Sequence, residues 1–500
     1  MTRTPGSTHS GDSWIGRNFR KMTIRIRSRF NRLLLSTGLA FTVAASALPA
    51  YAAQTPVTSP ASTGTAITAQ INGKPAEWGA RVYTYHSLTY VPVREGAVSL
   101  GAKVKWDKSR RAAVVTLNGD ELLYQPGADH VLVNGFELKM PGSTRYVDGV
   151  LTVPLRGLTE PLRADIQLNS GSSTRLSLTT DTATQMGTST NLQAVDNYLK
   201  KEQYSGNVLV AKDGEVLMRK GYGLASDTKL IRPTDLMRLG SLTKAFTAAS
   251  ILKLEEEGKL STEDSLSKFI PDYPRGDEIK LSMLLSHTSG IALNFKREDG
   301  IPLADTVAEI KASSLKFQPG TSYKYSNSGY VLLAFIIEQT SGMSYPDYVR
   351  TQILEPLGMS HSGTVTRNTP VQRGYEYDWQ QRFWKAVDYY FFSPSGTGSL
   401  YSTVDDMLTW SEALSDGKVL SEETLERMYT PNAFTPYAYA WGVSGEGDNK
   451  VAYHNGGGDG YTTGIRRGLN DGTVVILLGN HGGLDTNKMT LDIRKLVFGK

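Results

Sequence analysis

The stretch Leu239-Gly240-Ser241-Leu242-Thr243-Lys244-Ala245-Phe246 places a serine and a lysine three residues apart at the start of a helical pattern. Apolar residues recur at helical spacing as far as Leu254, and Gly258 is a plausible stop. Residues at positions i and i+3 share one helix face, so we expect Lys244 to lie beside Ser241. The same spacing also fits an N-capping serine followed by a solvated lysine. Motifs elsewhere in the chain are needed to distinguish this interpretation from a catalytic pair.

The chemical interpretation of the pair depends on the proton of the serine hydroxyl. A serine is a poor nucleophile until a base takes that proton. A lysine in a partly dry pocket loses basicity, and its free amine can accept the proton. The amino end of a helix adds N–H groups and positive dipole that stabilise an oxyanion. Ser241 and Lys244 can therefore form a nucleophile and its activator.

The composition suits soluble globular material, and the length suggests two or three domains. The 500 residues are 39% hydrophobic and 21% charged, and they include no cysteine, which excludes disulfide scaffolds and thiolate sites. Residues 1–52 hold eight Lys/Arg and one Asp, so the remainder has 46 cationic and 48 anionic side chains. This balance gives no support for nucleic-acid binding. No close ligand set indicates a metal or cofactor, so we expect none.

Residues 1–52 have the pattern of an export signal. Arginines precede an apolar run from Leu33 to about Leu48, and Ala50-Tyr51-Ala52 supplies a small-x-small cleavage pattern. An uncleaved anchor is the alternative, but the run is shorter and more polar than the ~20 residues that a membrane span needs. We therefore expect a secreted or cell-envelope protein with no stable membrane span after cleavage, in which residues 53–66 form a linker.

An internal repeat follows the linker. Tyr90-Val91-Pro92-Val93-Arg94 is echoed by Leu151-Thr152-Val153-Pro154-Leu155-Arg156, and each copy predicts a short strand, a short helix and a return strand. With the Gly-Ala-x-Val-x-Trp-Asp segment and Ile71-Asn72-Gly73, residues 67–180 resemble the copper amine oxidase N-terminal-like domain. His86 and His130 are far apart, so no copper site is expected. We interpret the module as a stalk or spacer; binding to a cell-surface polymer stays open.

The large domain is expected over residues 191–500, after a polar linker at 181–190. A helix is predicted at 191–201 and a last helix at 484–497. Strands are predicted at 205–212, 215–222, 441–443, 451–454, 461–467 and 473–479. Strands at both ends with helices between them predict one antiparallel sheet that draws on both termini, with a mostly helical subdomain inserted. The fold class is α+β, and a site is expected in the crevice between sheet and subdomain.

Further motifs follow Ser241 in order. They are Ser286-His287-Thr288-Ser289-Gly290, Tyr325-Ser326-Asn327 and His454-Asn455-Gly456-Gly457. Together they resemble the serine β-lactamase and penicillin-binding-protein superfamily, most closely its class C-like branch of D,D-peptidases, D-amino-acid amidases and esterases. The resemblance implies a β-lactamase-like fold and a serine acyl-enzyme.

The resemblance also implies the site residues. Ser241 matches the nucleophile, Lys244 its partner and Tyr325 a general acid/base, whose phenolate a nearby ammonium would favour. Asn327 matches a substrate-binding amide, although a turn residue is an equally good interpretation. The N–H groups of Ser241 and Gly457 would form the oxyanion hole, beside Gly456.

The third motif departs from the common Lys-Thr-Gly. With His454 in place of lysine, the strand is expected to offer a neutral hydrogen-bond donor rather than a permanent cation for a substrate carboxylate. This favours an esterase, amidase or peptidase over a strict carboxypeptidase, with small-molecule or cell-wall-derived peptide substrates. His287 is expected to be architectural. The alternative function is a non-catalytic surface protein that binds cell-wall fragments.

Overall fold

The computed structural model describes residues 68–76, 78, 82–170, 174–291, 295, 300–378, 383–387 and 396–500. The export signal predicted for residues 1–52 and the linker predicted for 53–66 lie outside the described residues. Residues 55–500 form one compact unit. Within it we distinguish an amino-terminal lobe, residues 68–180, from a carboxy-terminal lobe, residues 181–500.

The predicted repeat is the framework of the amino-terminal lobe. The first copy forms β4 (Leu88–Pro92), α2 (Val93–Ser99) and β5 (Lys103–Asp107), and the second forms β11 (Val150–Pro154), α3 (Leu155–Thr159) and β12 (Asp165–Ser170). β4 and β11 pair antiparallel, with Val91 opposite Val153. In each copy the proline ends the strand and precedes the first helical residue, a position where its missing N–H costs nothing.

Three small sheets surround these two helices. Their strand orders are β12-β13-β1-β2, β10-β11-β4-β3 and β5-β6-β7-β8-β9. The shared apolar core includes Trp78, Leu122, Tyr124 and Leu158. The other strands of the lobe are β1 (Thr68–Ile71), β2 (Lys74–Pro75), β3 (Tyr83–Tyr85), β6 (Ala112–Leu117), β7 (Asp120–Tyr124), β8 (His130–Val133), β9 (Phe136–Lys139), β10 (Arg145–Val147) and β13 (Thr174–Thr179).

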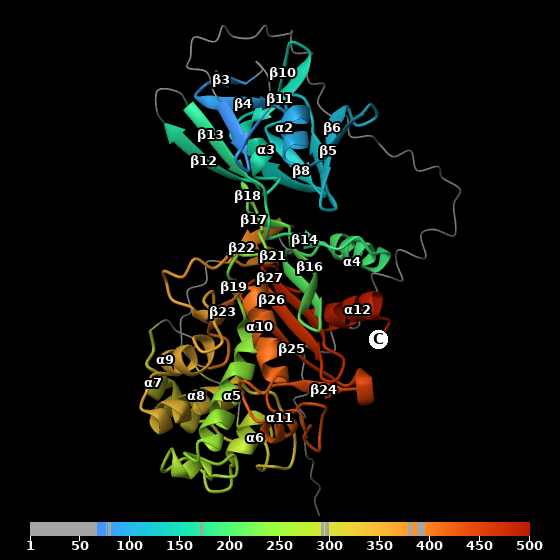
Figure 1. The fold of residues 1–500 in the computed structure, drawn as a ribbon. Coiled ribbons are helices and arrows are strands. Elements are labelled where there is room, and N and C mark those ends of the chain that lie inside the picture. The colour runs from blue at the N-terminus through green and yellow to red at the C-terminus, as the bar shows by residue number, and fades with distance from the viewer. Residues whose placement is uncertain are drawn as a thin grey trace, which may run out of the picture. The chain divides into compact units, whose positions relative to one another are not determined.

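The carboxy-terminal lobe is built on a seven-stranded sheet in which every neighbouring pair is antiparallel (Figure 1). The order β14-β16-β15-β27-β26-β25-β24 joins strands from both ends of the lobe, as the sequence predicts. One strand, β14, lies within the predicted 181–190 linker. The bounds are β14 (Gln185–Met186), β15 (Gly206–Lys212), β16 (Glu215–Tyr222), β24 (Gly442–Ser444), β25 (Val451–Gly458), β26 (Tyr461–Gly468) and β27 (Thr473–Gly479).

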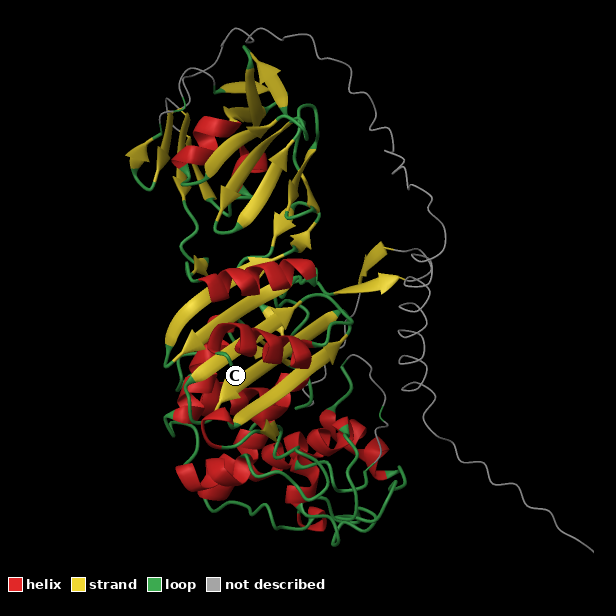
Figure 2. Ribbon diagram, turned by 90° about the vertical axis from the view of Figure 1, so that its right-hand side faces the viewer, coloured by secondary structure: helices red, strands yellow, loops and turns green. Residues whose placement is uncertain are grey.

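Both faces of this sheet are covered, which explains why the central strands β15 and β27 carry apolar residues on both faces. Along β15, Val208 and Val210 join one core cluster, whereas Leu209 and Ala211 join another. The first cluster also includes residues of α4 (Thr190–Lys201) and α12 (Thr486–Phe498), the two helices that lie across one face in Figure 2. Because successive side chains of a strand point to opposite faces, β15 and β27 contribute to both cores.

The other face of the sheet carries the helical subdomain, whose helices supply most of the larger core. A small sheet has the strand order β19-β23-β20, and its strand β19 directly precedes the Ser241 segment. The helices are α5 (Thr243–Glu256), α6 (Leu281–Leu285), α7 (Leu303–Lys311), α8 (Asn327–Ser341), α9 (Tyr345–Val349), α10 (Val404–Ser415) and α11 (Glu422–Met428); the remaining short strands are β17 (Leu224–Ser226), β18 (Lys229–Leu230), β19 (Met237–Arg238), β20 (Gly363–Thr364), β21 (Tyr375–Asp378), β22 (Phe383–Ala386) and β23 (Leu400–Ser402).

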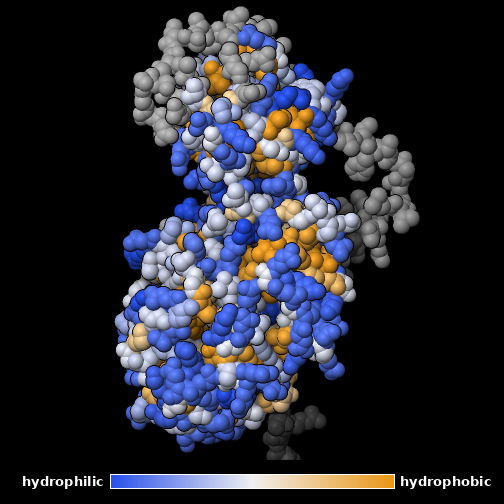
Figure 3. All heavy atoms as spheres, in the orientation of Figure 1, coloured by the Kyte–Doolittle hydropathy of each residue, from blue (hydrophilic) through white to orange (hydrophobic). Residues whose placement is uncertain are grey.

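Hydrophilic residues cover most of the face drawn in Figure 3, with apolar areas between them. None of the helices in the described ranges is both long enough and apolar enough to cross a bilayer. Most of the large apolar side chains in the described residues are buried in the cores of the two lobes.

Candidate active site

Ser241 lies in a single 3-10 turn, η2 (Gly240–Leu242), between β19 and the long helix α5. The predicted helix thus begins two residues later than Ser241, at Thr243, and ends at Glu256 just before Gly258, which has a positive φ of 70°. Leu239 N donates to Leu400 O at 2.9 Å, which anchors the turn to β23. The serine is therefore held at the entrance to α5 by the sheet that precedes it.

The turn lies directly against β25, and Gly456 allows this approach. A Cβ at position 456 would lie 2.4 Å from Leu239 O, 2.3 Å from Thr463 Oγ1 and 3.0 Å from Ser241 N. Such distances leave no room for a side chain, since two of the three atoms belong to backbone. Glycine at 456 is therefore what lets the strand and the Ser241 turn meet.

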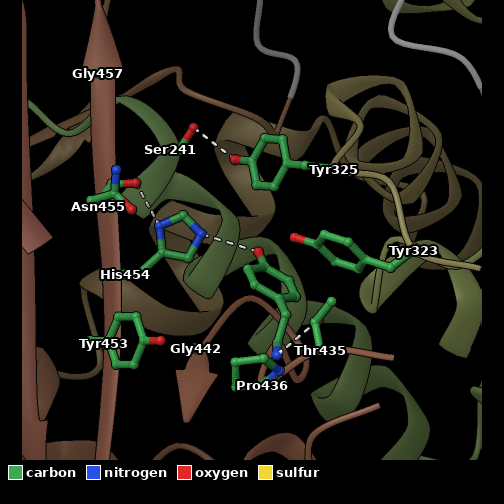
Figure 4. A pocket seen from close by; sticks show the side chains of 11 residues that line it. Ser241, Tyr323, Tyr325, Thr435, Pro436, Gly442, Tyr453, His454, Asn455 and Gly457 are labelled. Carbon is green, nitrogen blue, oxygen red and sulfur yellow. Dashed lines mark hydrogen bonds between the residues drawn. The ribbon is translucent and has the colours of Figure 1, made fainter. Parts of the chain in front are cut away.

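Three side chains from separate parts of the chain meet at the serine. Lys244 Nζ and Ser241 Oγ form a hydrogen bond of 3.0 Å, and Tyr325 OH donates to Ser241 Oγ at 3.0 Å (Figure 4 shows the second contact). Lys244 Nζ also donates to Thr397 O at 2.8 Å. The amine and the phenol that the sequence analysis singled out thus both lie within hydrogen-bonding distance of the serine hydroxyl, and Lys244 Nζ lies 5.1 Å from the centroid of the Tyr325 ring.

Burial shifts the pKa values of the two side chains that contact Ser241. It lowers the pKa of the Lys244 ammonium well below 10.5, so the amine is neutral more readily than an exposed lysine. Burial also raises the pKa of the Tyr325 phenol above 10.0, and the hydrogen bond to Ser241 offsets this only in part. Burial thus favours the neutral form of both side chains, and it opposes the phenolate expected for Tyr325.

His287 fixes the position of Tyr325. Its carbonyl accepts from Lys324 N at 3.0 Å, its Nδ1 accepts from Ser326 N at 3.3 Å, and its ring centroid is 4.3 Å from that of Tyr325. Because Nδ1 accepts, the ring proton is on Nε2, which has no hydrogen-bond partner in the described part of the chain. His287 is buried, and its backbone has a positive φ of 59°. These contacts agree with the architectural role expected from the sequence.

The second histidine, His454, is engaged on both ring nitrogens. Nδ1 lies 2.8 Å from Asn455 O, and Nε2 lies 3.1 Å from Tyr437 OH. A carbonyl can only accept, so Nδ1 carries the proton and Nε2 accepts from the Tyr437 hydroxyl. Burial, with a smaller effect of Lys244, lowers the pKa of His454 to about 3. The ring is therefore neutral near pH 7, as predicted, but its donor faces the protein rather than a ligand.

A pocket of about 460 Å³ opens beside Ser241, within the size range of ligand sites. Tyrosines form much of its wall, and Figure 4 shows the hydroxyl groups of Tyr323 and Tyr325 directed toward the side on which Ser241 and His454 lie. The described lining residues include no aspartate, glutamate, lysine or arginine. They are Ser241, Tyr323, Tyr325, Thr435, Pro436, Tyr437, Gly442, Tyr453, His454, Asn455 and Gly457.

The remaining predicted residues divide into two groups. Gly457 lines the pocket with Ser241, whereas Gly456 and Asn327 are not among its described lining residues. The Oδ1 atom of Asn327 is buried with no hydrogen-bond partner among the described residues, at the first position of α8. Geometry therefore supports a packing position for Gly456, and it does not place the Asn327 side chain in the cavity.

The sequence analysis did not identify three of the tyrosines that line the pocket, Tyr323, Tyr437 and Tyr453. Tyr323 precedes the Tyr-x-Asn motif by two residues, and Tyr437 and Tyr453 flank strand β24. No spacing rule marks these tyrosines as pocket residues; only their density near two recognised motifs was a usable signal. In the described ranges, no group of three or more histidine, aspartate or glutamate side chains is arranged to hold a metal ion.

Comparisons with known proteins agree with this geometry. The family model described as beta-lactamase matches residues 192–497, and the model described as copper amine oxidase N-terminal domain matches residues 70–176, which confirms both resemblances. PbpX of Bacillus subtilis (strain 168) is 35% identical over 260 residues, which are 50% of this chain and 65% of that protein. The match thus spans just under two thirds of this relative's length.

Two solved structures share the fold. The octameric penicillin-binding protein homologue from Pyrococcus abyssi is 27% identical, with a TM-score of 0.56, over 62% of this chain and 77% of that chain. The D-amino acid amidase from Ochrobactrum anthropi SV3 is 22% identical, with a TM-score of 0.54, over 61% of this chain and 98% of that chain. At this level of identity the second likeness concerns the fold alone.

Proposed function

Because the chain belongs to the beta-lactamase family, we propose that it is a secreted serine hydrolase that forms an acyl-enzyme on Ser241 with an ester or amide substrate. The observation that carries the proposal is the meeting of Lys244 Nζ and Tyr325 OH at Ser241 Oγ, each at 3.0 Å. A nucleophile in contact with both a base and an acid is the arrangement that acyl transfer requires.

Burial favours the neutral form of both partners, and we assign the two roles on that basis. The neutral amine of Lys244 takes the proton of Ser241 as Oγ bonds to the substrate carbonyl carbon. Tyr325, a neutral phenol, gives its proton to the departing oxygen or nitrogen as the bond to the carbonyl carbon breaks, and the Lys244 ammonium returns a proton to the phenolate. Water then attacks the acyl-enzyme, and the same two groups move its protons in the reverse sense.

The oxyanion formed during attack needs donors close to the serine. The N–H groups of Ser241 and Gly457 are our candidates, since the η2 turn and β25 are in contact and both residues line the pocket. The close packing at Gly456 supports this assignment, because any side chain there would push the two segments apart.

The lining of the pocket indicates the substrate class. With a neutral His454 and no described charged side chain in the wall, the cavity offers phenol groups and apolar ring surface. Such a wall favours uncharged groups next to the scissile bond over a free carboxylate, which would lose its hydration without gaining a cation. We therefore place esters and amides, including D-amino-acid amides, ahead of carboxypeptidase substrates.

Covalent labelling tests this proposal. Purified protein is incubated with a fluorescent fluorophosphonate and, in parallel, with a fluorescent penicillin, and the labelled residue is identified by mass spectrometry. We expect label on Ser241 and none on Ser241→Ala. The matched control is Ser250→Ala on the same helix, where the hydroxyl donates to Phe246 O and lies away from the site.

Turnover of p-nitrophenyl esters, D-amino-acid amides, D-Ala-D-Ala peptides and nitrocefin then ranks the substrate classes. Ester or amide turnover above nitrocefin turnover supports the proposed class, and robust nitrocefin hydrolysis without esterase activity contradicts it. A folded protein that neither probe labels would instead support the alternative of a non-catalytic protein that binds cell-wall fragments.

A further inference from the structure

A buried cluster of ionised side chains joins the two lobes. Asp120 of β7 contacts Arg163 at 2.7 Å and Lys220 of β16 at 2.7 Å, and Lys220 also contacts Asp196 of α4 at 2.9 Å. The exposed fraction of these four side chains is at most 7%. Asp120 and Arg163 come from the amino-terminal lobe, whereas Lys220 and Asp196 come from the carboxy-terminal lobe.

Backbone groups close around the same cluster. Lys220 Nζ donates to Asn118 O at 2.8 Å, and Arg163 donates to Gly221 O at 2.9 Å. The β6–β7 turn enters the cluster at Gly119, where φ is 82° and a Cβ would lie 2.9 Å from Asp196 Oδ2. The turn tip therefore fits against the other lobe only because residue 119 has no side chain.

The second contact is a short hairpin of the carboxy-terminal lobe, β17–β18. Leu230 of this hairpin is 3% exposed and belongs to the apolar core of the amino-terminal lobe, and Leu224 packs against that core. Lys139 N donates to Asp227 O at 2.8 Å, and Leu230 N donates to Glu160 Oε1 at 3.3 Å. An element of one lobe thus completes the core of the other.

The two contacts have different energetic roles. Burial of apolar side chains such as Leu230 favours association without regard to orientation. Buried ion pairs add little net stability, but a docking arrangement that leaves one of the charges unpaired is strongly disfavoured. Burial would raise the pKa of the Asp120 carboxyl, but Arg163 and Lys220 together lower it, so the aspartate stays ionised.

The chain that follows the β17–β18 hairpin leads directly to Ser241. Arg163 Nε donates to Ile231 O at 3.4 Å, directly after β18, and ten residues later the chain reaches Ser241. At the other strand of the hairpin, Asn480 donates to Leu224 O at 3.1 Å. The segment from β17 to the nucleophile therefore has one end held by the amino-terminal lobe.

We propose that the amino-terminal lobe is a docked structural part of the hydrolase, which clamps the β17–β18 hairpin and thereby supports the segment that leads to Ser241. This goes beyond the proposed function, and it differs from a spacer on a flexible tether. A spacer on a flexible tether does not need a buried contact with its neighbour, whereas four charged side chains and Leu230 are buried between these two lobes.

The first experiment separates docking from tethering in the full chain. A protease recognition sequence is inserted after Thr182, the chain is cut there, and the products are run on size-exclusion chromatography. We expect the two pieces to co-elute. Pieces that separate without denaturant would overturn the proposal, and this outcome does not depend on catalytic activity.

The second experiment tests the ion cluster in the uncut chain. Asp120→Asn leaves Lys220 and Arg163 incompletely paired, so we expect the midpoint of thermal unfolding to fall by about 5 °C. Amide hydrogen exchange across 224–238 should rise about tenfold. Asp129→Asn is the matched control, because that carboxylate is exposed and contacts only His130 among the described side chains.

Equal midpoints and equal exchange for Asp120→Asn and Asp129→Asn would overturn the role of the cluster. If Asp120→Asn does not fold, the cut parent chain still decides between docking and tethering. A failure of the Ser241 labelling experiment would leave both readouts intact, so the two proposals fail separately.

Discussion

The ring of His287 lies against the ring of Tyr325 with centroids 4.3 Å apart, and His287 accepts hydrogen bonds from the residues on both sides of that tyrosine. The phenol is therefore aimed at Ser241 by a residue that does not itself contact the serine Oγ in any described hydrogen bond. His287 achieves this with a left-handed backbone, φ 59°, which is uncommon for a residue other than glycine.

Two substitutions separate the ring of His287 from its backbone conformation. Asparagine tolerates the left-handed region and offers an acceptor to Ser326 N, whereas valine is β-branched and offers none. We expect His287→Val to lose about 1–3 kcal/mol more unfolding free energy than His287→Asn, measured by urea denaturation. Equal losses would show that the backbone conformation carries no cost. Both variants should lower turnover, since both remove the ring that packs on Tyr325.

Lys244 is expected to matter for chemistry and not for folding. Its amine is fully buried, and burial alone accounts for its lowered pKa. Lys244→Met therefore replaces a buried polar side chain by an apolar one of similar shape. We expect turnover to fall by about 10²–10⁴-fold, with stability unchanged or higher by about 1 kcal/mol. Lys253→Met, on the same helix but partly exposed, is the control and should change neither quantity. A large loss of stability in Lys244→Met would contradict this view.

Two adjacent glycines provide a matched pair. A Cβ on Gly456 would meet Leu239 O at 2.4 Å, whereas the nearest atom to a Cβ on Gly457 is 3.8 Å away. Displacement of the Ser241 turn by even 1 Å is expected to cost about 100-fold in kcat/KM, so Gly456→Ala should be nearly inactive. Gly457→Ala should retain the unfolding free energy of the parent protein, although residue 457 lines the pocket, whereas Gly456→Ala should lose stability. Equal unfolding free energies for the two variants would show that the close approach of β25 is unimportant.

Buried histidines predict acid lability. Burial lowers the pKa of His454 to about 3 and of His481 to about 4, and it lowers that of His287 well below 6.5. Between pH 6.5 and 4 the unfolded chain binds more protons than the folded chain, so stability rises with pH in this window and is lost as pH falls. Each histidine contributes about 1.4 kcal/mol per pH unit there.

Urea denaturation at pH 7, 6 and 5 checks this expectation. The slope of unfolding free energy against pH should become shallower in His454→Gln, and it should be unchanged in the control His361→Gln, whose side chain is 67% exposed. A neutral His454 also means that its own titration produces no step in activity at pH 6–7. Such a step, absent in His454→Gln, would show that the ring is protonated in this range.

The sequence alone predicted most elements of the fold. The apolar alternation and turn residues marked β15, β16 and β27 to within a residue, since local spacing reports strand periodicity directly. Where boundaries moved, tertiary contacts were the cause: β25 runs on to Gly458 because its glycine-rich end pairs with β26, a partner that no local pattern reveals.

What the sequence by itself determined was the chemistry available: a serine, a lysine and a phenol in the motif order of one family, on an α+β chain with strands at both ends. Only the tertiary structure decided the burial that favours the neutral forms of Lys244 and Tyr325, the engagement of His454 by Tyr437, and the contacts of the amino-terminal lobe through Asp120 and Lys220. The physical reason is that these properties depend on burial and on contacts between distant segments. Spacing along the chain reports neither.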